Sequence, residues 1–189
     1  AMSWLDNDAE EAFARYRTAL DGAEQLGDLV LRMGGLEGLA DCYRRWGRFS
    51  DAIHHVETAY RLPLKDGYPD TPTARRAATR RVPLALKLSR WHAELARLPE
   101  ARRWIEEAQR WANDSASRWH RAALADGEAD LLFWEGDKTG AHARAAEAVE
   151  LAQQLHDPAI LTRARTTMCL VHLEYGELGV AAQEILMVR

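Results

Sequence analysis

A small residue recurs along this chain at a nearly constant interval, and that interval constrains the fold more than any other feature. The recurring residues are Ala12, Ala52, Ala101, Ala141 and Ala181, so successive separations are 40, 49, 40 and 40 residues. Self-similarity at this period is typical of chains that stack one supersecondary unit on copies of itself. We therefore expect an array of similar units.

Each of these alanines lies in a similar local context. Five residues before the last four of them stand Gly47, Ala96, Gly136 and Gly176. Seven residues after all five stand Ala19, Ala59, Ala108, Ala148 and Val188. No stretch alternates polar and apolar residues over a convincing length, which disfavours strands. Each unit is therefore predicted to be a helix, a tight turn and a second helix, with small residues where helices cross, and the chain is predicted to be all-α.

The clearest unit has a small Ala40, an aromatic Tyr43 three residues later, Gly47 at the turn, and small Ala52 and Ala59 in the second helix. This pattern resembles the tetratricopeptide repeat (TPR). The resemblance implies a right-handed superhelical solenoid of antiparallel helix hairpins, with about four and a half repeats. It covers 1–189 as a single helical repeat domain, divided approximately into 1–27 (partial), 28–66, 72–114, 115–156 and 157–189.

The sequence departs from the family pattern in its spacing. The period is about 40 residues where the family has 34, a variant similar to the repeat regions of large bacterial signal-transducing and transcriptional regulators. The 49-residue step contains an insertion over 63–81. It carries Arg75, Arg76, Arg80 and Arg81 on a predicted extended helix, where Arg76 and Arg80 share a face. This face is either solvated or contacts an acidic partner.

Turn and capping residues predict the helix boundaries. Thr71 or Thr73 is expected to cap the helix after the insertion, and residues 114–115 are expected to separate another helix pair. Asp157 is a predicted N-cap, with Pro158 at the first helical position. The boundaries agree with the repeat pattern.

Three glycines fall inside a predicted helix: Gly34, Gly35 and Gly38. Each costs on the order of 1 kcal/mol relative to alanine there. Two explanations remain open, namely close approach of the preceding helix or room for a bound peptide.

Composition excludes several classes of function. The formal net charge is −4 and the isoelectric point is near 6.0, whereas a nucleic-acid-binding domain usually has a net basic surface. Apolar runs are far shorter than the roughly 20 residues that span a bilayer, and the N-terminus lacks a signal-peptide pattern. Cys42 and Cys169 suit reduced core thiols. We expect a cytoplasmic protein with neither nucleic-acid nor membrane binding by this segment.

Motifs for catalysis, metals or cofactors are not found. The sequence has no GxSxG or HExxH motif, and "GGLEG" at 34–38 lacks the lysine and hydroxyl residue of a phosphate-binding loop. His54 and His55 are adjacent, so their side chains diverge on a helix. His92 and His172 are expected in the core. We predict a protein that is not an enzyme, with no metal and no cofactor.

The resemblance implies that the first helix of each repeat lines a concave groove. The predicted groove residues are Glu37, Asp41, Arg44, Arg45, Lys87, Arg90, Asp126, Asp130, Trp134, Arg163 and Thr167. Among these, the cationic side chains could hold a carboxylate or phosphate and the aspartates a basic group, while Trp134 is the candidate hot spot. The alternative is that these charges pair with one another across adjacent helices.

These observations predict a non-catalytic module that binds a protein or peptide in the groove, as part of a bacterial regulatory or scaffold protein. A second hypothesis is an effector-sensing region of a larger transcriptional regulator, which binds a small molecule. A third is a structural module that self-associates, because Ile185, Leu186 and Val188 lack a following helix to cover them. The chain is then either a fragment of a longer array or a homodimer joined through its terminal helices.

Overall fold

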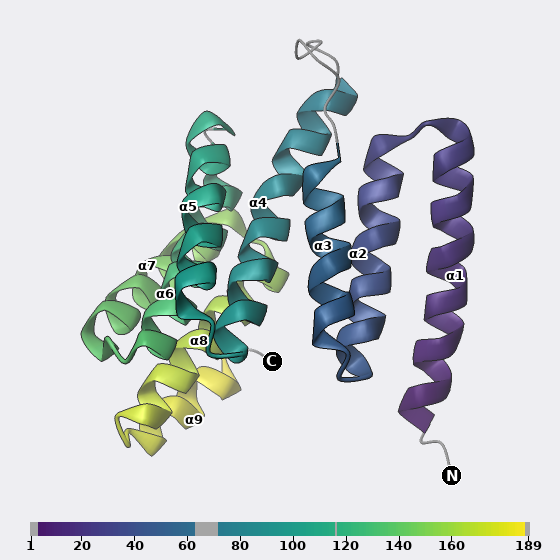
Figure 1. The fold of residues 1–189 in the computed structure, drawn as a ribbon. Helices are drawn as coiled ribbons and strands as arrows, with labels where there is room; N and C mark the ends of the chain where they lie inside the picture. Colours follow the sequence, from purple (N-terminus) through teal and green to yellow (C-terminus); the bar gives the residue numbers. More distant parts are fainter. Residues whose placement is uncertain (1–3, 63–71, 116, 188–189) are drawn as a thin grey trace. The chain divides into compact units, whose positions relative to one another are not determined.

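The computed structural model describes residues 4–62, 72–115 and 117–187, and every regular element within them is a helix. The helices, shown in Figure 1, are α1 (Trp4–Leu26), α2 (Leu29–Arg45), α3 (Phe49–Arg61), α4 (Pro72–Glu94), α5 (Leu98–Ser115), α6 (Arg118–Glu135), α7 (Lys138–Leu155), α8 (Pro158–Glu174) and α9 (Leu178–Leu186). The chain is all-α, as the sequence predicts. Among these helices, none is long and apolar enough to cross a membrane.

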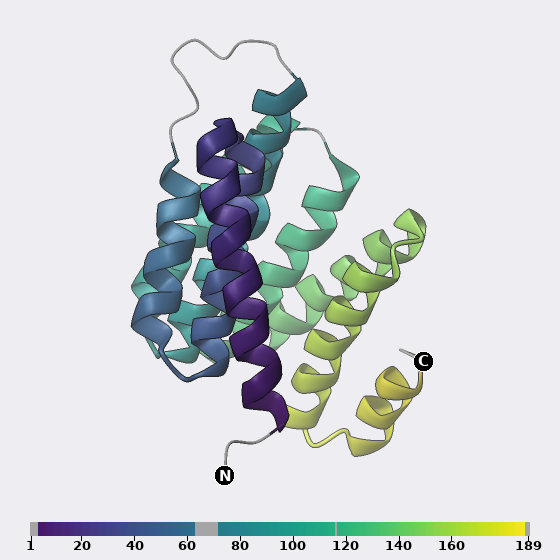
Figure 2. The ribbon, with the colours of Figure 1, turned by 90° about the vertical axis from the view of Figure 1, so that its right-hand side faces the viewer.

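The chain divides into two compact units, Ala1–Leu88 and Ser89–Arg189, with the boundary inside α4. We call them unit 1 and unit 2. In unit 1, α1 packs on α2 and α2 packs on α3, each pair antiparallel and joined by a short turn (Figure 1). In unit 2, consecutive helices from α5 to α9 pack in the same way, and α6 also packs on α8. Figure 2 shows the α8–α9 hairpin at the end of the described chain.

The predicted turn positions adopt left-handed backbone conformations. Gly47, Gly136 and Gly176 have φ angles of 72°, 80° and 76°. Ala96 occupies the equivalent position with φ 57°, although a Cβ makes this conformation unfavourable. The prediction of a tight turn between the two helices of a repeat is therefore confirmed at all four of these positions.

Helix caps agree with the sequence in one case and differ in others. Asp157 accepts hydrogen bonds from the first backbone N–H groups of α8, and Pro158 stands at its start, as predicted. Between α5 and α6 the capping residue is Ser117, because α5 continues through residue 115. Thr73 lies inside α4, so it is not the cap of that helix, and Thr71 lies outside the described residues.

The recurring small residues are buried in four of the five repeats. Ala52, Ala101, Ala141 and Ala181 are almost completely inaccessible. Seven residues later, Ala59, Ala108 and Ala148 are also buried. The expectation fails in α1, where Ala12 is half-buried and Ala19 is exposed, because α1 packs on α2 through another face, and Val188 lies outside the described residues. The small residues are therefore the ones that adjacent helices cover.

Two of the three helical glycines allow close helix packing. A Cβ on Gly35 would lie 3.2 Å from the Cβ of Leu20 in α1, and a Cβ on Gly38 would overlap the ring of Tyr16. The close-approach interpretation is confirmed for these two residues. It does not apply to Gly34, where the nearest atom to such a Cβ is an Arg80 nitrogen at 3.8 Å.

Other core predictions are also confirmed. Cys42 and Cys169 are buried free thiols. His92 and His172 are buried, and the Nδ1 of His172 lies 2.6 Å from a carboxylate oxygen of Glu177.

Candidate binding surface

Most of the predicted groove residues come together as two polar clusters, one in each unit. The unit-1 cluster consists of Glu37 and Asp41 on α2 with Arg80 and Lys87 on α4. Arg80 Nη2 donates to Glu37 at 2.7 Å, and Lys87 Nζ lies 2.8 Å from the other oxygen of Glu37. Lys87 also donates to both oxygens of Asp41 at 3.0 Å. The two acids therefore share two cations from one neighbouring helix.

The charges of the unit-1 cluster lower the pKa of Glu37. Partial burial of this carboxyl acts in the opposite direction and raises its pKa, but Lys87 and Arg80 together outweigh it. Folding therefore favours the ionised form of Glu37. The cluster has no net charge with which to attract a ligand.

The unit-2 cluster consists of Arg90 on α4, Asp126 and Asp130 on α6, and Arg163 and Thr167 on α8. Asp126 accepts hydrogen bonds from Arg163 Nε at 2.6 Å and Thr167 Oγ1 at 2.8 Å. Arg90 donates to Asp126 at 3.4 Å and to Asp130 at 2.8 Å. The Asp126 side chain is only 1% exposed. Both oxygens of this buried side chain have hydrogen-bond donors, as the burial of a polar group requires.

Burial shifts the ionisation of the second acid in this cluster. Desolvation raises the pKa of Asp130, and the Arg90 guanidinium only partly compensates. The pKa of Arg90 is raised in turn, because the attraction of Asp130 and Asp126 exceeds the effect of its own burial. The unit-2 cluster is thus a buried network that links α4, α6 and α8.

These contacts match the alternative in which the predicted groove charges pair across adjacent helices. Lys87, Arg90 and Arg163 each bind acidic side chains of their own unit. An acidic ligand would have to compete with these side chains. Of the remaining predicted residues, Arg44 and Arg45 are exposed at the end of α2. Arg44 lies 5.9 Å from the ring of Phe49.

Trp134 is the largest predicted groove side chain that stays accessible. It stands in the last turn of α6 and is 44% exposed, with its ring 5.9 Å from that of Phe133. Leu170 and Leu173 on α8 have similar exposure, and the sequence reasoning does not single them out. The repeat register could have found them, because Leu170 follows Asp130 by 40 residues and Leu173 follows Phe133 by 40.

The arginines of the insertion do not form one solvated face. Arg76 is exposed, whereas Arg80 turns toward α2 and binds Glu37. Arg81 donates to the backbone oxygen of Leu62 at 3.0 Å and lies over the ring of Tyr60. The side chain of Arg75 lies outside the described part of the structure. Arg80 and Arg81 therefore make their contacts within unit 1.

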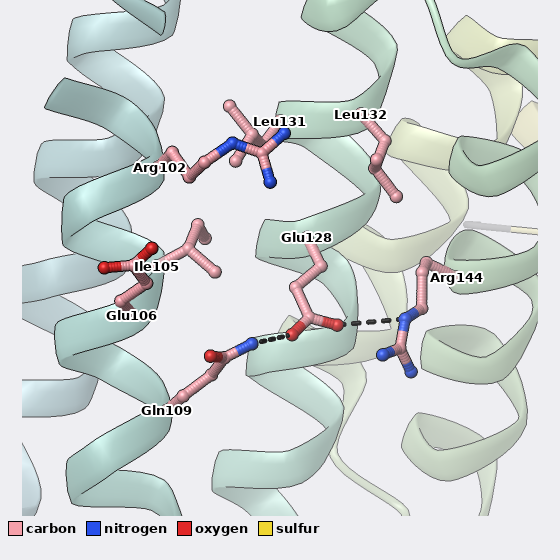
Figure 3. A pocket seen from close by; sticks show the side chains of 8 residues that line it. All are labelled: Arg102, Ile105, Glu106, Gln109, Glu128, Leu131, Leu132 and Arg144. Atoms are coloured by element: carbon pink, nitrogen blue, oxygen red, sulfur yellow. Dashed lines mark hydrogen bonds and ion pairs between the residues drawn. The ribbon is translucent and has the colours of Figure 1, made fainter. Parts of the chain in front are cut away.

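A separate pocket of about 270 Å³ opens between α5, α6 and α7 of unit 2 (Figure 3). Its lining residues are Arg102, Ile105, Glu106, Gln109, Glu128, Leu131, Leu132 and Arg144. Glu128 lies at its centre, where it accepts a hydrogen bond from Gln109 Nε2 at 2.6 Å and pairs with Arg144 Nε at 3.0 Å. The leucines and Ile105 supply an apolar surface beside this polar group.

Unit 1 has an equivalent pocket of about 210 Å³ between α1, α2 and α3. Six of its lining residues precede six of the unit-2 pocket by the same 89 positions. They are Phe13, Arg17, Leu20, Leu39, Tyr43 and His55, which correspond to Arg102, Glu106, Gln109, Glu128, Leu132 and Arg144. At three of these positions unit 1 has apolar Phe13, Leu20 and Leu39, where unit 2 has polar Arg102, Gln109 and Glu128. Sequence reasoning missed both pockets, although the repeat register would have aligned them.

No group of three or more histidine, cysteine or acidic side chains able to hold a metal occurs within the part of the chain that the structure describes. His54 and His55 have ring centroids 5.8 Å apart with nearly perpendicular planes.

Comparisons with known proteins define the fold. No family model matches the chain, and no curated protein matches it. Among solved structures, it is similar to the crystal structure of BtubC (BKLC) from P. vanneervenii, with a TM-score of 0.65 and 23% sequence identity. The match covers 96% of this chain and 72% of that one. At this identity the likeness establishes a shared helical fold.

Proposed function

We propose that this chain is a non-catalytic, TPR-like binding module. It holds a segment of a partner protein in the groove that the first helix of each repeat lines. The proposal includes a right-handed solenoid arrangement and a place in a cytoplasmic bacterial regulator or scaffold. It is supported by the regular period of the repeats, by the left-handed turn residue in four of them, and by the residues that converge from α6 and α8. A helical repeat of this kind presents an extended surface to a partner.

The observation that carries this proposal is the exposure of Trp134 beside charges that are already paired. Tryptophan is enriched among the residues that dominate binding energy at protein interfaces. The acids and cations of the unit-2 cluster pair with one another, whereas Trp134 is an exposed aromatic side chain with contact area open to a partner. The partner is therefore expected to place an apolar side chain against this indole.

The test is to select peptides from a displayed library on the immobilised chain and to measure their affinity by calorimetry. Trp134→Ala should weaken binding at least tenfold, the range of an interface hot spot at about 1.4 kcal/mol or more. Tyr175→Ala is the matched control, because Tyr175 is an equally exposed aromatic residue in unit 2. It should change the affinity less than twofold. Equal losses from both variants, or failure to enrich any peptide, would count against the proposal.

A second function, binding of a small effector, is favoured by the unit-2 pocket. Glu128 stands where the equivalent unit-1 residue is Leu39, and its side chain is mostly buried. A mostly buried carboxylate at a position that unit 1 fills with leucine departs from the repeat pattern, and such departures concentrate at functional sites. The lining of the pocket combines apolar surface with a few placed polar groups, as ligand sites do.

This second function is tested by thermal-shift screening of a metabolite collection. A true ligand should raise the melting temperature of the wild-type chain but not that of Glu128→Leu, which restores the unit-1 residue. Glu150→Gln, at an exposed position on α7, serves as the control and should respond like the wild type. A collection without any hit, or hits that Glu128→Leu retains, would reject this pocket as an effector site.

A further inference from the structure

The unit-1 pocket carries two opposite charges without a partner in the protein. Arg17 and Asp21 both line this pocket from α1, and both are exposed. Within the described part of the chain, neither side chain makes an ion pair or a hydrogen bond. By contrast, Lys87, Arg90 and Arg144 each bind a carboxylate. The unit-1 pocket therefore offers one cation and one anion to a ligand.

The order of these two residues on α1 disfavours an ion pair between them. They lie four residues apart, and a pair of this spacing is more stable when the acidic residue comes first. Glu11 and Arg15 have that favourable order on the same helix, and they are paired. Arg17 and Asp21 have the reverse order. Their charges stay separate on one side of the pocket.

The equivalent positions of unit 2 do not offer the same two charges. At the positions 89 residues after Arg17 and Asp21 stand Glu106 and Arg110, so the order of the charges is reversed. Arg110 donates a hydrogen bond to Glu107 at 2.6 Å. The cation is therefore paired in unit 2, and the two unpaired charges belong to unit 1 alone.

The rest of the unit-1 pocket is largely apolar and aromatic. Leu39 is buried beneath it, and the rings of Phe13 and Tyr43 lie 5.4 Å apart in nearly perpendicular planes. The ring of His55 lies 4.9 Å from that of Tyr43. Such walls suit an aromatic ring in edge-to-face contact. At about 210 Å³ the pocket is smaller than the roughly 300–1,000 Å³ of sites for drug-sized ligands, so it suits a ligand with one large side chain.

The pocket is complete within unit 1. All of its lining residues belong to α1, α2 and α3. On α2 it is lined by Leu39 and Tyr43, whereas Glu37 and Asp41 bind cations of α4. Successive helical residues are about 100° apart, so positions two residues apart point to nearly opposite sides. The pocket and the ion pairs with α4 consequently occupy different faces of α2.

We propose that the unit-1 pocket binds a free aromatic α-amino acid. Arg17 binds its carboxylate and Asp21 binds its ammonium group, while its ring lies against Phe13 and Tyr43. A residue inside a polypeptide carries neither of these charges at its α-carbon, so the two unpaired side chains favour the free zwitterion over a side chain of a partner protein. This site is separate from Trp134 and from the unit-2 pocket, and it does not rest on the functions proposed above.

The probe is L-phenylalanine, compared with hydrocinnamate, which lacks the ammonium group, and phenethylamine, which lacks the carboxylate. Calorimetry measures the affinity of each for the full 189-residue chain. Phenylalanine should bind about fivefold more tightly than either analogue, the effect of one ion pair near solvent. Arg17→Gln should remove its advantage over phenethylamine, and Asp21→Asn its advantage over hydrocinnamate. Arg15→Gln is the control and should change neither, because Arg15 does not line this pocket.

Three results would overturn the proposal: no binding of phenylalanine at millimolar concentration, equal affinity for all three probes, or losses in Arg15→Gln as large as those in the pocket variants. Arg17 and Asp21 are exposed, so the variants should fold, and circular dichroism checks this. A fourth probe, N-acetylphenylalanine amide, represents a residue within a polypeptide. Tighter binding of this neutral probe than of phenylalanine would assign the pocket to a side chain of a polypeptide and would also reject the free amino acid.

Discussion

Two pairs of acidic residues, 89 positions apart, occupy equivalent places in the two units and behave differently. Glu37 and Asp41 lie four residues apart on α2, and Asp126 and Asp130 lie four residues apart on α6. In unit 1 the side chains are 22% and 53% exposed, whereas in unit 2 they are 1% and 12% exposed. The same spacing on the same kind of helix therefore gives a surface ion-pair cluster in one unit and a buried network in the other.

The origin of the difference is the number of helices that supply partners. In unit 1 both cations come from α4. In unit 2 Arg90 comes from α4, while Arg163 and Thr167 come from α8 and cover Asp126. The comparison teaches that equivalent repeat positions determine which side chains contact one another, while the neighbouring helices determine how well these contacts are shielded from water. The degree of burial then determines how strongly each charge affects stability.

The largest expected effect comes from removing one acid from each pair. Asp126→Ala should destabilise the protein by about 3–5 kcal/mol, because it leaves two arginines beside an uncompensated buried site. Glu37→Ala should cost about 1 kcal/mol, because its partners are closer to solvent and Asp41 still binds Lys87. Urea denaturation followed by circular dichroism measures both values. Similar costs for the two variants would show that burial does not separate the clusters.

A smaller effect is expected from pH, with opposite signs in the two units. The pKa of Glu37 is lowered on folding, so the unfolded chain binds its proton first and this contribution to stability is lost as the pH falls below about 5. The pKa of Asp130 is raised on folding, so the folded chain binds its proton first and acidification favours the folded state in the same range. Each unit of pKa shift corresponds to about 1.4 kcal/mol.

Two variants separate these contributions. Glu37→Gln removes the acid-sensitive contribution of unit 1, so the stability difference from the wild type should shrink between pH 7 and pH 4. Asp130→Asn removes the opposing contribution, so the wild type should gain stability relative to this variant over the same range. The measurement is the free energy of unfolding in urea at several pH values. Parallel curves for all three proteins would contradict the assigned directions.

The smallest effect is expected at the turns, where one repeat departs from the others. Ala96 holds a left-handed conformation that glycine holds in the other hairpins. Ala96→Gly should therefore stabilise the protein by about 1 kcal/mol, and Gly136→Ala should destabilise it by a similar amount. Thermal melts compare the two variants with the wild type. A loss of stability in Ala96→Gly would mean that the alanine side chain makes a contact worth more than the strain.

Much of the fold could be predicted because it rests on local rules. Glycine at Gly47, Gly136 and Gly176 and the Asp157–Pro158 cap follow from backbone conformation and capping chemistry. Ala52 and Ala141 are buried because a helix presents the same face at a constant phase. The prediction failed for Ala19, since burial there depends on whether a neighbouring helix lies on that face.

The candidate site was less predictable. The sequence placed Lys87, Arg90 and Asp126 on the expected helix faces, but it left open whether they bind a ligand or one another. Their pairing depends on contacts between helices, such as Arg90 with Asp130 across 40 residues. The pockets escaped detection for the same reason, because each is lined by three helices.

The sequence by itself determined the helical class, the 40-residue period, the turn positions and the set of side chains on each helix face. These depend on interactions within a few residues, which spacing and residue type encode directly. Only the tertiary structure decided that Asp126 is buried while Asp41 is exposed, and that Glu128 lines a pocket. Each of these outcomes depends on which helix lies across the residue and how much water it excludes, and residues far along the chain supply that helix.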